Sequence, residues 1–124
     1  MTTAINTEDH DRAMQVVKAT LTFASTNQAV TTTHSYYGFV TQVFIDHGGT
    51  APTNLWDLVV TDEVGVDVLN GKGANIASAT DQYTFTQADL DNGMACSGQL
   101  TFTGTTGGTA SGVAEIYLYI ARYQ

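Results

Sequence analysis

The segment AEIYLYI, residues 114–120, decides the fold class. Its apolar residues occupy every second position, and Glu115, Tyr117 and Tyr119 stand between them. Successive side chains of a β-strand point to opposite faces of a sheet, so this pattern predicts a strand with one face in a core. The glutamate and the two tyrosines are expected on the other face.

The same alternation recurs toward the N-terminus. Apolar residues of segment 17–23 (VKATLTF) alternate with Lys18, Thr20 and Thr22, which predicts a second strand with one polar face. Segments 82–86 and 95–104 alternate in the same way and are each predicted to be one strand. Residues 55–61 and 66–69 are predicted to form a hairpin around the turn Asp62–Gly65, and 70–80 an exposed loop.

The segment YYGFVTQVFID, residues 36–46, is apolar on both faces. Strict alternation places Val40 and Phe44 on one face, and Phe39, Val43 and Ile45 on the other. A strand of this kind lies at the centre of a core or at an interface.

The composition favours strands throughout the chain. Twenty-one of the 124 residues are threonine and twelve are glycine, and both are poor helix formers. Turn signals separate seven or eight short strands, and no long helix is predicted. We therefore expect an all-β fold: an antiparallel β-sandwich of jelly-roll or immunoglobulin-like type over residues 14–124, preceded by a polar N-terminal arm at residues 1–13. Within this arm, a helical turn is expected near Thr7–Arg12.

The charge balance excludes several function classes. The formal net charge is −8, with four Lys and Arg against twelve Asp and Glu, so we expect no nucleic-acid and no membrane partner. The acidic residues near the N-terminus do not resemble a signal peptide. The single cysteine, Cys96, excludes an internal disulfide and fits synthesis in a reducing cytoplasm.

No pattern of residues predicts catalysis, a cofactor or a metal site. The carboxylates Asp62, Glu63 and Asp67 cluster in one turn and could hold a cation, but turn chemistry explains them equally well. Asp89 and Asp91 are interpreted in the same way. His10, His34 and His47 are predicted to be surface or loop-end residues, and Cys96 a buried thiol. We therefore expect a protein that is not an enzyme.

The aromatic residues are the most informative candidates for function. Tyr and Trp outside a core mark protein interfaces or sugar-stacking platforms, unless loops cover them. All three interpretations remain open from the sequence. The candidate protein-interface residues are Tyr36, Tyr37, Trp56, Tyr117 and Tyr119.

Several segments in order resemble a family of small virion proteins of tailed bacteriophages. The resemblance rests on YGFV at 37–40, TAPT at 50–53, WDLVVTDE at 56–63, GVDVL at 65–69 and GKGAN at 71–75, and it continues through the closing strand 112–120. It covers about residues 36–120. These proteins include head decoration (cement) proteins and other minor capsid proteins.

The resemblance implies a structural protein made in the host cytoplasm and located on the capsid surface of the virion. Its expected partners are the major capsid protein or other virion proteins, and we expect a homo-oligomer, a trimer or a dimer. It would stabilise the shell through many weak contacts. Two alternatives remain: a head–tail connector or tail component, and, from another class, a carbohydrate-binding module.

Overall fold

The chain folds into strands, as the alternating pattern predicts. The structure is a computed structural model that describes residues 4–8, 14–23, 27–47, 50–77, 82–85, 94–105 and 112–122. No helix occurs among these residues, and none of them forms a helix that could cross a membrane. The strands are Ala4–Glu8 (β1), Met14–Thr22 (β2), Gln28–Thr31 (β3), Tyr36–Asp46 (β4), Asp57–Thr61 (β5), Gln82–Phe85 (β6), Met94–Gly98 (β7), Thr101–Thr105 (β8) and Val113–Arg122 (β9).

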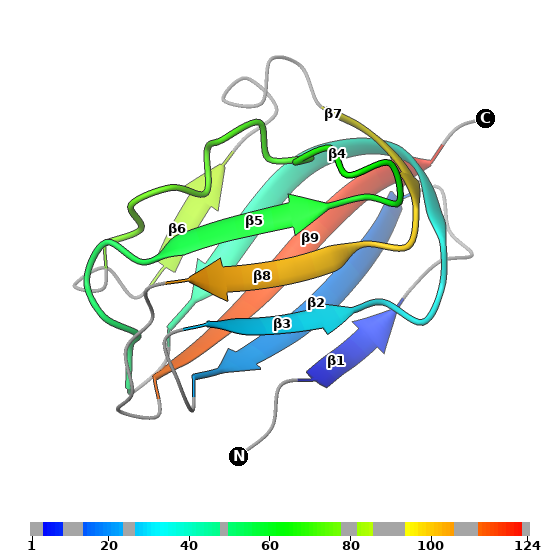
Figure 1. The fold of residues 1–124 in the computed structure, drawn as a ribbon. Coiled ribbons are helices and arrows are strands. Elements are labelled where there is room, and N and C mark those ends of the chain that lie inside the picture. Colours follow the sequence, from blue (N-terminus) through cyan, green and yellow to red (C-terminus); the bar gives the residue numbers. More distant parts are fainter. Residues whose placement is uncertain are drawn as a thin grey trace.

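The strands form two antiparallel sheets that pack face to face (Figure 1). The larger sheet has the order β1-β2-β9-β4-β6, and β7 pairs with the opposite end of the same edge of β4. The smaller sheet has the order β3-β8-β5. The predicted fold class, an all-β antiparallel sandwich, is confirmed.

The pairing of the strands is nested, which identifies the jelly-roll form of the sandwich. β2 pairs with β9, β3 with β8, and β4 with β7, so the chain resembles one long hairpin rolled over itself. In the sequence between β4 and β7, β5 contacts the segment that follows it through an isolated bridge from Thr61 to Asp67 and a backbone bond from Val68 N to Val60 O. Consecutive strands from β2 to β5 therefore alternate between the two sheets, as the two Greek keys of a jelly roll require.

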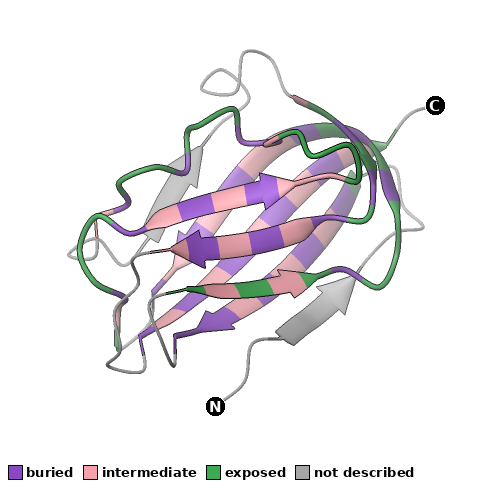
Figure 2. Cartoon of the chain, in the orientation of Figure 1, coloured by how far each residue is buried: buried purple, intermediate pink, exposed green. Residues whose placement is uncertain are grey.

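The core lies between the sheets and is filled by the alternate residues of each strand. Buried and half-buried residues alternate along β2, β5, β8 and β9 (Figure 2). Ile116, Leu118 and Ile120 are fully buried, as predicted for the closing strand. The larger sheet thus has one face in the core and an outer face that no described element covers.

A β-bulge in β4 makes the predicted face assignment of this strand wrong. The pairing of β4 with β9 shifts register between Val40 and Gln42, so one extra residue occupies the strand. Val43 and Ile45 therefore lie in the core with Val40, whereas Phe39 and Phe44 lie on the outer face. Alternation alone misses this change of phase because a bulge resets the period of two.

Three other segments differ from the prediction. Residues 95–104, predicted as one strand, divide at Gly98 (φ 93°) into β7 and β8, which belong to different sheets. Residues 66–69, predicted as the returning strand of a hairpin, are not a named strand; they make the isolated bridge at Asp67 and the backbone bonds Val68 N to Val60 O and Asp62 N to Val66 O. In the loop predicted as exposed, Ile76 is fully buried and bridges Trp56.

Two further strands lie where none was predicted. Gln28–Thr31, within a predicted polar connection, forms β3 at the edge of the smaller sheet. Ala4–Glu8, within the predicted arm, pairs with β2 as β1, so no helical turn begins at Thr7. Residues 9–13 of the arm lie outside the described residues, as do 86–93 with Asp89 and Asp91.

Candidate functional site

Two of the five predicted interface residues belong to the core. Tyr36 and Trp56 are fully buried, so their prediction as interface residues is wrong. Tyr36 begins β4 on its inner face, and Trp56 precedes β5, where tertiary packing takes its ring inward. Tyr37 is 53% exposed, and Tyr117 and Tyr119 are half-buried.

The indole of Trp56 is held by a buried polar contact and by aromatic packing. Its Nε1–H donates to Nε2 of His47 over 3.0 Å, and His47 is itself 1% exposed. The ring of Phe23 packs edge-on against the indole with centroids 5.7 Å apart. His47 is thus a strand-end residue, as predicted, but its side chain is a buried acceptor rather than a surface group.

The outer face of the larger sheet consists of cross-strand rows. Tyr117 on β9 lies between Lys18 on β2 and Phe44 on β4. The Phe44 ring centre is 5.6 Å from that of Tyr117, and Lys18 Nζ is 5.3 Å from the Tyr117 ring centre. Lys18 Nζ also lies 3.0 Å from Glu115 Oε2, and this hydrogen bond raises the pKa of Lys18. The rings of Phe44 and Tyr117 thus pack together, and the ammonium group of Lys18 pairs with the carboxylate of Glu115.

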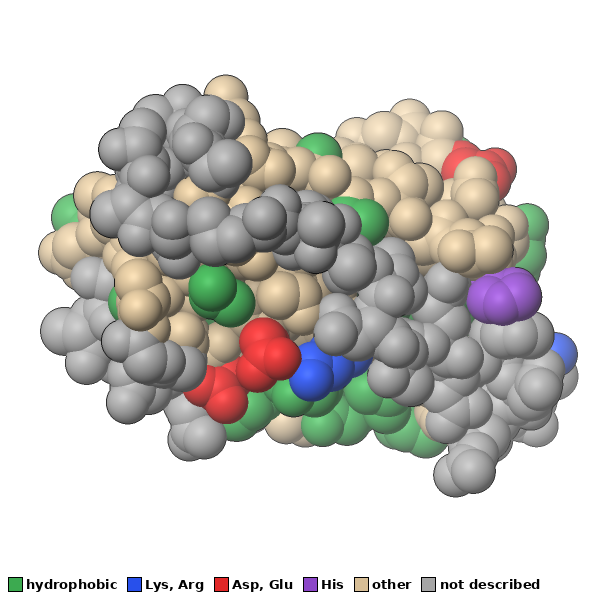
Figure 3. Space-filling model, turned by 90° about the horizontal axis from the view of Figure 1, so that it is seen from below, with side chains coloured by type: hydrophobic (Ala, Val, Ile, Leu, Met, Phe, Trp, Pro, Cys, Tyr) green, Lys and Arg blue, Asp and Glu red, His purple; other side chains and the backbone are tan. Residues whose placement is uncertain are grey.

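A different row of the same face is apolar across four strands. Met14 of β2, Ala121 of β9, Phe39 of β4 and Ala95 of β7 are cross-strand neighbours. Met14 is 47% exposed and Phe39 40% exposed. Tyr37 follows on the same face of β4, two residues from Phe39. Viewed from below, hydrophobic side chains line the margin on which the larger sheet lies, next to acidic and basic groups (Figure 3).

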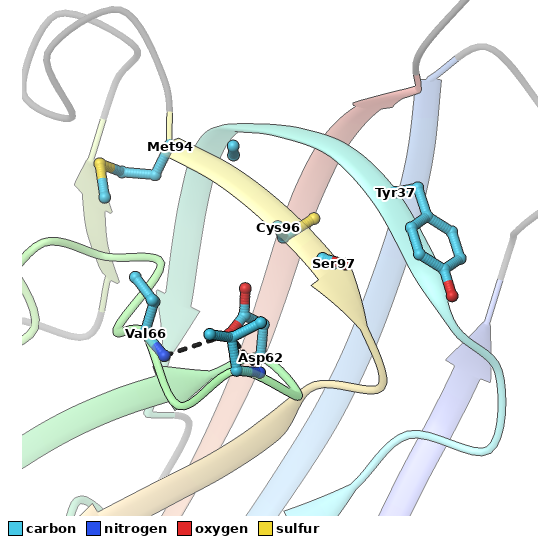
Figure 4. Close-up of a pocket in the computed structure, with 8 residues that line it drawn as sticks. Tyr37, Asp62, Val66, Met94, Cys96 and Ser97 are labelled. Carbon is cyan, nitrogen blue, oxygen red and sulfur yellow. Dashed lines mark hydrogen bonds between the residues drawn. The ribbon is translucent and has the colours of Figure 1, made fainter.

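A groove of about 430 Å³ adjoins this row at Ala95 and is also lined by Tyr37. It runs along β7 and faces the turn at 62–66 (Figure 4). Figure 4 places Asp62 and Val66 on one side of β7 and Tyr37 on the other. We call it the β7 groove; its lining residues are Tyr37, Asp62, Val64, Val66, Met94, Ala95, Cys96 and Ser97.

The turn that forms one wall of the β7 groove is organised by Asp62. Its Oδ1 accepts hydrogen bonds from the backbone N–H groups of Val64, Gly65 and Val66 over 3.0–3.1 Å. A carboxylate that accepts several backbone donors fixes a turn. Because the turn is held by its backbone, the side chains of Val64 and Val66 stay outside the core, 76% and 44% exposed.

The acidic residues of this region serve the backbone, which supports the turn interpretation of the sequence. Oδ1 of Asp67 accepts from Val60 and Leu69 N–H, and its Oδ2 from Gly71 N–H. Oε1 of Glu63 accepts from Gln99 N–H over 3.1 Å. In the part of the chain that the structure describes, no group of three His, Cys, Asp or Glu residues could hold a metal.

Cys96 lies beneath the β7 groove with its thiol in the core. It is 2% exposed, and its Sγ–H donates to the carbonyl of Tyr36 over 3.9 Å. Burial raises the pKa of the thiol to about 11. A thiol with this pKa stays protonated near neutral pH and is a poor nucleophile, as predicted for a buried structural cysteine.

The exposed hydrophobic residues gather in one region. Of the six large hydrophobic side chains exposed in the described residues, all but Leu55 belong to the apolar row or the β7 groove. We call this surface the apolar strip; its members are Met14, Tyr37, Phe39, Val64 and Val66. The sequence predicted only Tyr37 as a member, because the bulge in β4 places Phe39 and the turn at 62–66 places Val64 and Val66; Met14 begins β2 on its outer face.

Comparison with known proteins does not identify a family. No protein-family model and no curated protein sequence matches the chain.

Proposed function

We propose that this protein is a structural, non-enzymatic component of a phage virion that binds the outside of the capsid as a decoration protein and stabilises the shell. The observation that carries this proposal is the apolar strip on an open sheet face. Exposed apolar residues that are contiguous mark interaction sites more often than scattered ones do. The resemblance of residues 36–120 to phage virion proteins supplies the class of partner.

The surface chemistry supports attachment to protein. Lys18 and Glu115 form an ion pair on the outer face. Their opposite charges cancel, so this pair adds no net charge to the face that carries the strip. A capsid offers many equivalent sites, and an oligomer of this chain would engage several at once, so a weak contact per copy is sufficient for stable decoration.

The test is co-sedimentation with mature capsids that lack their decoration protein. We expect the wild-type protein to bind and to raise the temperature at which the capsids release DNA. The double variant Tyr37→Ser/Phe39→Ser removes the centre of the apolar strip and is expected to abolish binding. The control is Leu55→Ser, because Leu55 is equally exposed, at 52%, and lies outside the strip.

Three results would count against the proposal. Absence of wild-type binding to capsids would refute it. Recovery of the protein with isolated necks or tails would favour the connector or tail alternative. Sugar binding on a glycan array that Tyr37→Ala abolishes would favour a carbohydrate-binding module, although Trp56, its best stacking residue, is buried.

A further inference from the structure

We propose that the β7 groove binds a short extended segment of a partner polypeptide, which adds as a further strand to the edge of β7 that does not pair with β4. The segment would be apolar at alternate positions and would carry a Lys or Arg next to Asp62. This inference concerns the edge of the sheet rather than its face, and it does not depend on what kind of particle or assembly the partner belongs to.

In the part of the chain that the structure describes, one side of the β7 backbone is available for pairing. Its other side pairs with β4 from Gly98 to Met94. The carbonyl of Ser97 accepts from Glu63 N–H over 3.2 Å, so it points away from β4 and toward the turn at 62–66. In an antiparallel pair, the N–H and C=O of one residue point to the same side, and residues two apart share that side. The backbone groups of Ala95 therefore also face the groove.

These groups supply the register that a strand requires. Within the described part of the chain, the bond from Glu63 is the only hydrogen bond on this side of β7. Ala95 thus offers an N–H and a C=O, and Ser97 offers an N–H. An added strand that exchanges two bonds with Ala95 reproduces the ordinary pattern of β-augmentation, in which backbone bonds give affinity and side-chain pockets give specificity.

The side chains around this edge select an apolar segment. Val64, Val66 and Tyr37 line the groove, with Val66 on one side of β7 and Tyr37 on the other (Figure 4). The volume of about 430 Å³ lies in the range of sites that bind ligands. Ala95 to Ser97 spans about 7 Å at 3.3 Å per residue, so a segment of roughly three or four residues fills the contact.

In the described residues the turn at 62–66 bonds to this edge at Ser97, and the rest of β7 lacks the features that prevent strand addition. Exposed edges are normally protected by charged side chains, proline or bulges. β7 has the sequence MACSG, which contains no charge and no proline, and its pairing with β4 shows no bulge. Among the groove residues only Asp62 is charged, and the chain carries a net charge of −8. The groove therefore complements a segment with a basic residue.

The experiment starts from a randomised seven-residue peptide library displayed against the full-length protein. We expect enrichment of peptides with alternating apolar residues and a Lys or Arg. The best peptide is then added to ¹⁵N-labelled protein, in parallel with a copy that is N-methylated at alternate backbone positions. Shifts and slower hydrogen exchange at the amides of Ala95 and Ser97 are expected with the first peptide and not with the second.

Two variants test the edge and the wall separately. Ala95→Pro removes the outward N–H, at an edge position where proline is tolerated, and should weaken peptide binding by roughly tenfold or more. Val66→Lys places a charge in the apolar wall and should have a similar effect, which keeps the test valid if the proline variant does not fold. Leu55→Ser should bind the peptide as the wild type does.

Each alternative occupant has a distinct signature. A library without enrichment overturns the proposal, as does equal binding of the N-methylated peptide, which would mean side-chain docking only. Concentration-dependent self-association that Val66→Lys abolishes would assign the groove to a second copy of this chain and would also overturn it. Loss of capsid binding in Phe39→Ser, which changes no residue that lines the groove, together with retained peptide binding would support strand addition separately from the decoration role.

Discussion

Replacing Trp56 by Phe should destabilise the protein strongly, because the structure makes this residue a core anchor. The phenyl ring has no donor for Nε2 of His47, and loss of a buried hydrogen-bond partner costs ~1–3 kcal/mol. The smaller ring also leaves a gap of roughly 40 Å³, which at about 24 cal/mol per Å³ adds ~1 kcal/mol. The expected loss in the free energy of unfolding is therefore about 2–4 kcal/mol.

This loss converts directly into a melting temperature. At about 2.1 cal/mol/K per residue, a chain of this length has an unfolding entropy of ~0.26 kcal/mol/K, so each kcal/mol lowers Tm by ~4 °C. Trp56→Phe should melt about 8–15 °C below the wild type in calorimetry and show a lower urea midpoint. Tyr37→Phe, the control on the exposed face, should stay within about 0.5 kcal/mol of the wild type. A Trp56→Phe variant as stable as this control would refute the assignment of Trp56 to the core.

Three further substitutions test the packing. Gly104→Ala should cost ~1–3 kcal/mol in urea unfolding, because a Cβ there would lie 2.5 Å from Cζ of Phe23; a neutral effect would mean that the sheets separate easily. Thr32→Val should cost ~1–3 kcal/mol, since its buried hydroxyl donates to His34 O (2.7 Å) and accepts from Leu100 N–H (3.0 Å); Thr32→Ser is the control that keeps both bonds. Cys96→Ala should remove a pH dependence. The folded pKa of about 11 exceeds the ordinary value of 9.0, so the native state holds the proton longer, and the wild type should lose stability relative to the variant as the pH rises from 9.0 to about 11. Parallel stability curves in that interval would contradict the burial of the thiol.

The sequence predicted the fold class because alternation is a local property. In β9, each residue from Ala114 to Ile120 has the burial that its parity predicts, since both the core and the outer face extend along the whole strand. Alternation fails where a non-local contact changes the phase. The bulge between Val40 and Gln42 exists only in the pairing of β4 with β9, and it moves Phe44 to the outer face.

Prediction of the candidate site was less successful for the same physical reason. An aromatic residue with polar neighbours is ambiguous, because its burial depends on which segment packs over it. Trp56 is buried through its bridge to Ile76 and its bond to His47, and neither partner can be inferred from the segment around the indole. Tyr36 and Tyr37 are adjacent in the sequence and point to opposite faces of β4. Tyr36 is buried because its face of β4 packs against the smaller sheet, and the sequence around the two residues does not indicate which face that is.

The position of the β7 groove follows from the jelly-roll connectivity rather than from any sequence motif. The groove is formed by three segments that lie tens of residues apart in the sequence: the start of β4, the turn that follows β5, and β7 itself. Nested pairing sets the start of β4 against the end of β7, while the bond from Glu63 to Ser97 attaches the turn to the same end. Gly98 then allows the chain to leave for the other sheet: a Cβ there would meet the side chain of Glu63, which needs this space to accept the Gln99 N–H. Within the described residues, the topology that buries the core thus also leaves Ala95 on the outer edge of β7 without a backbone partner. The two proposed contacts, on the face and at this edge, share Tyr37.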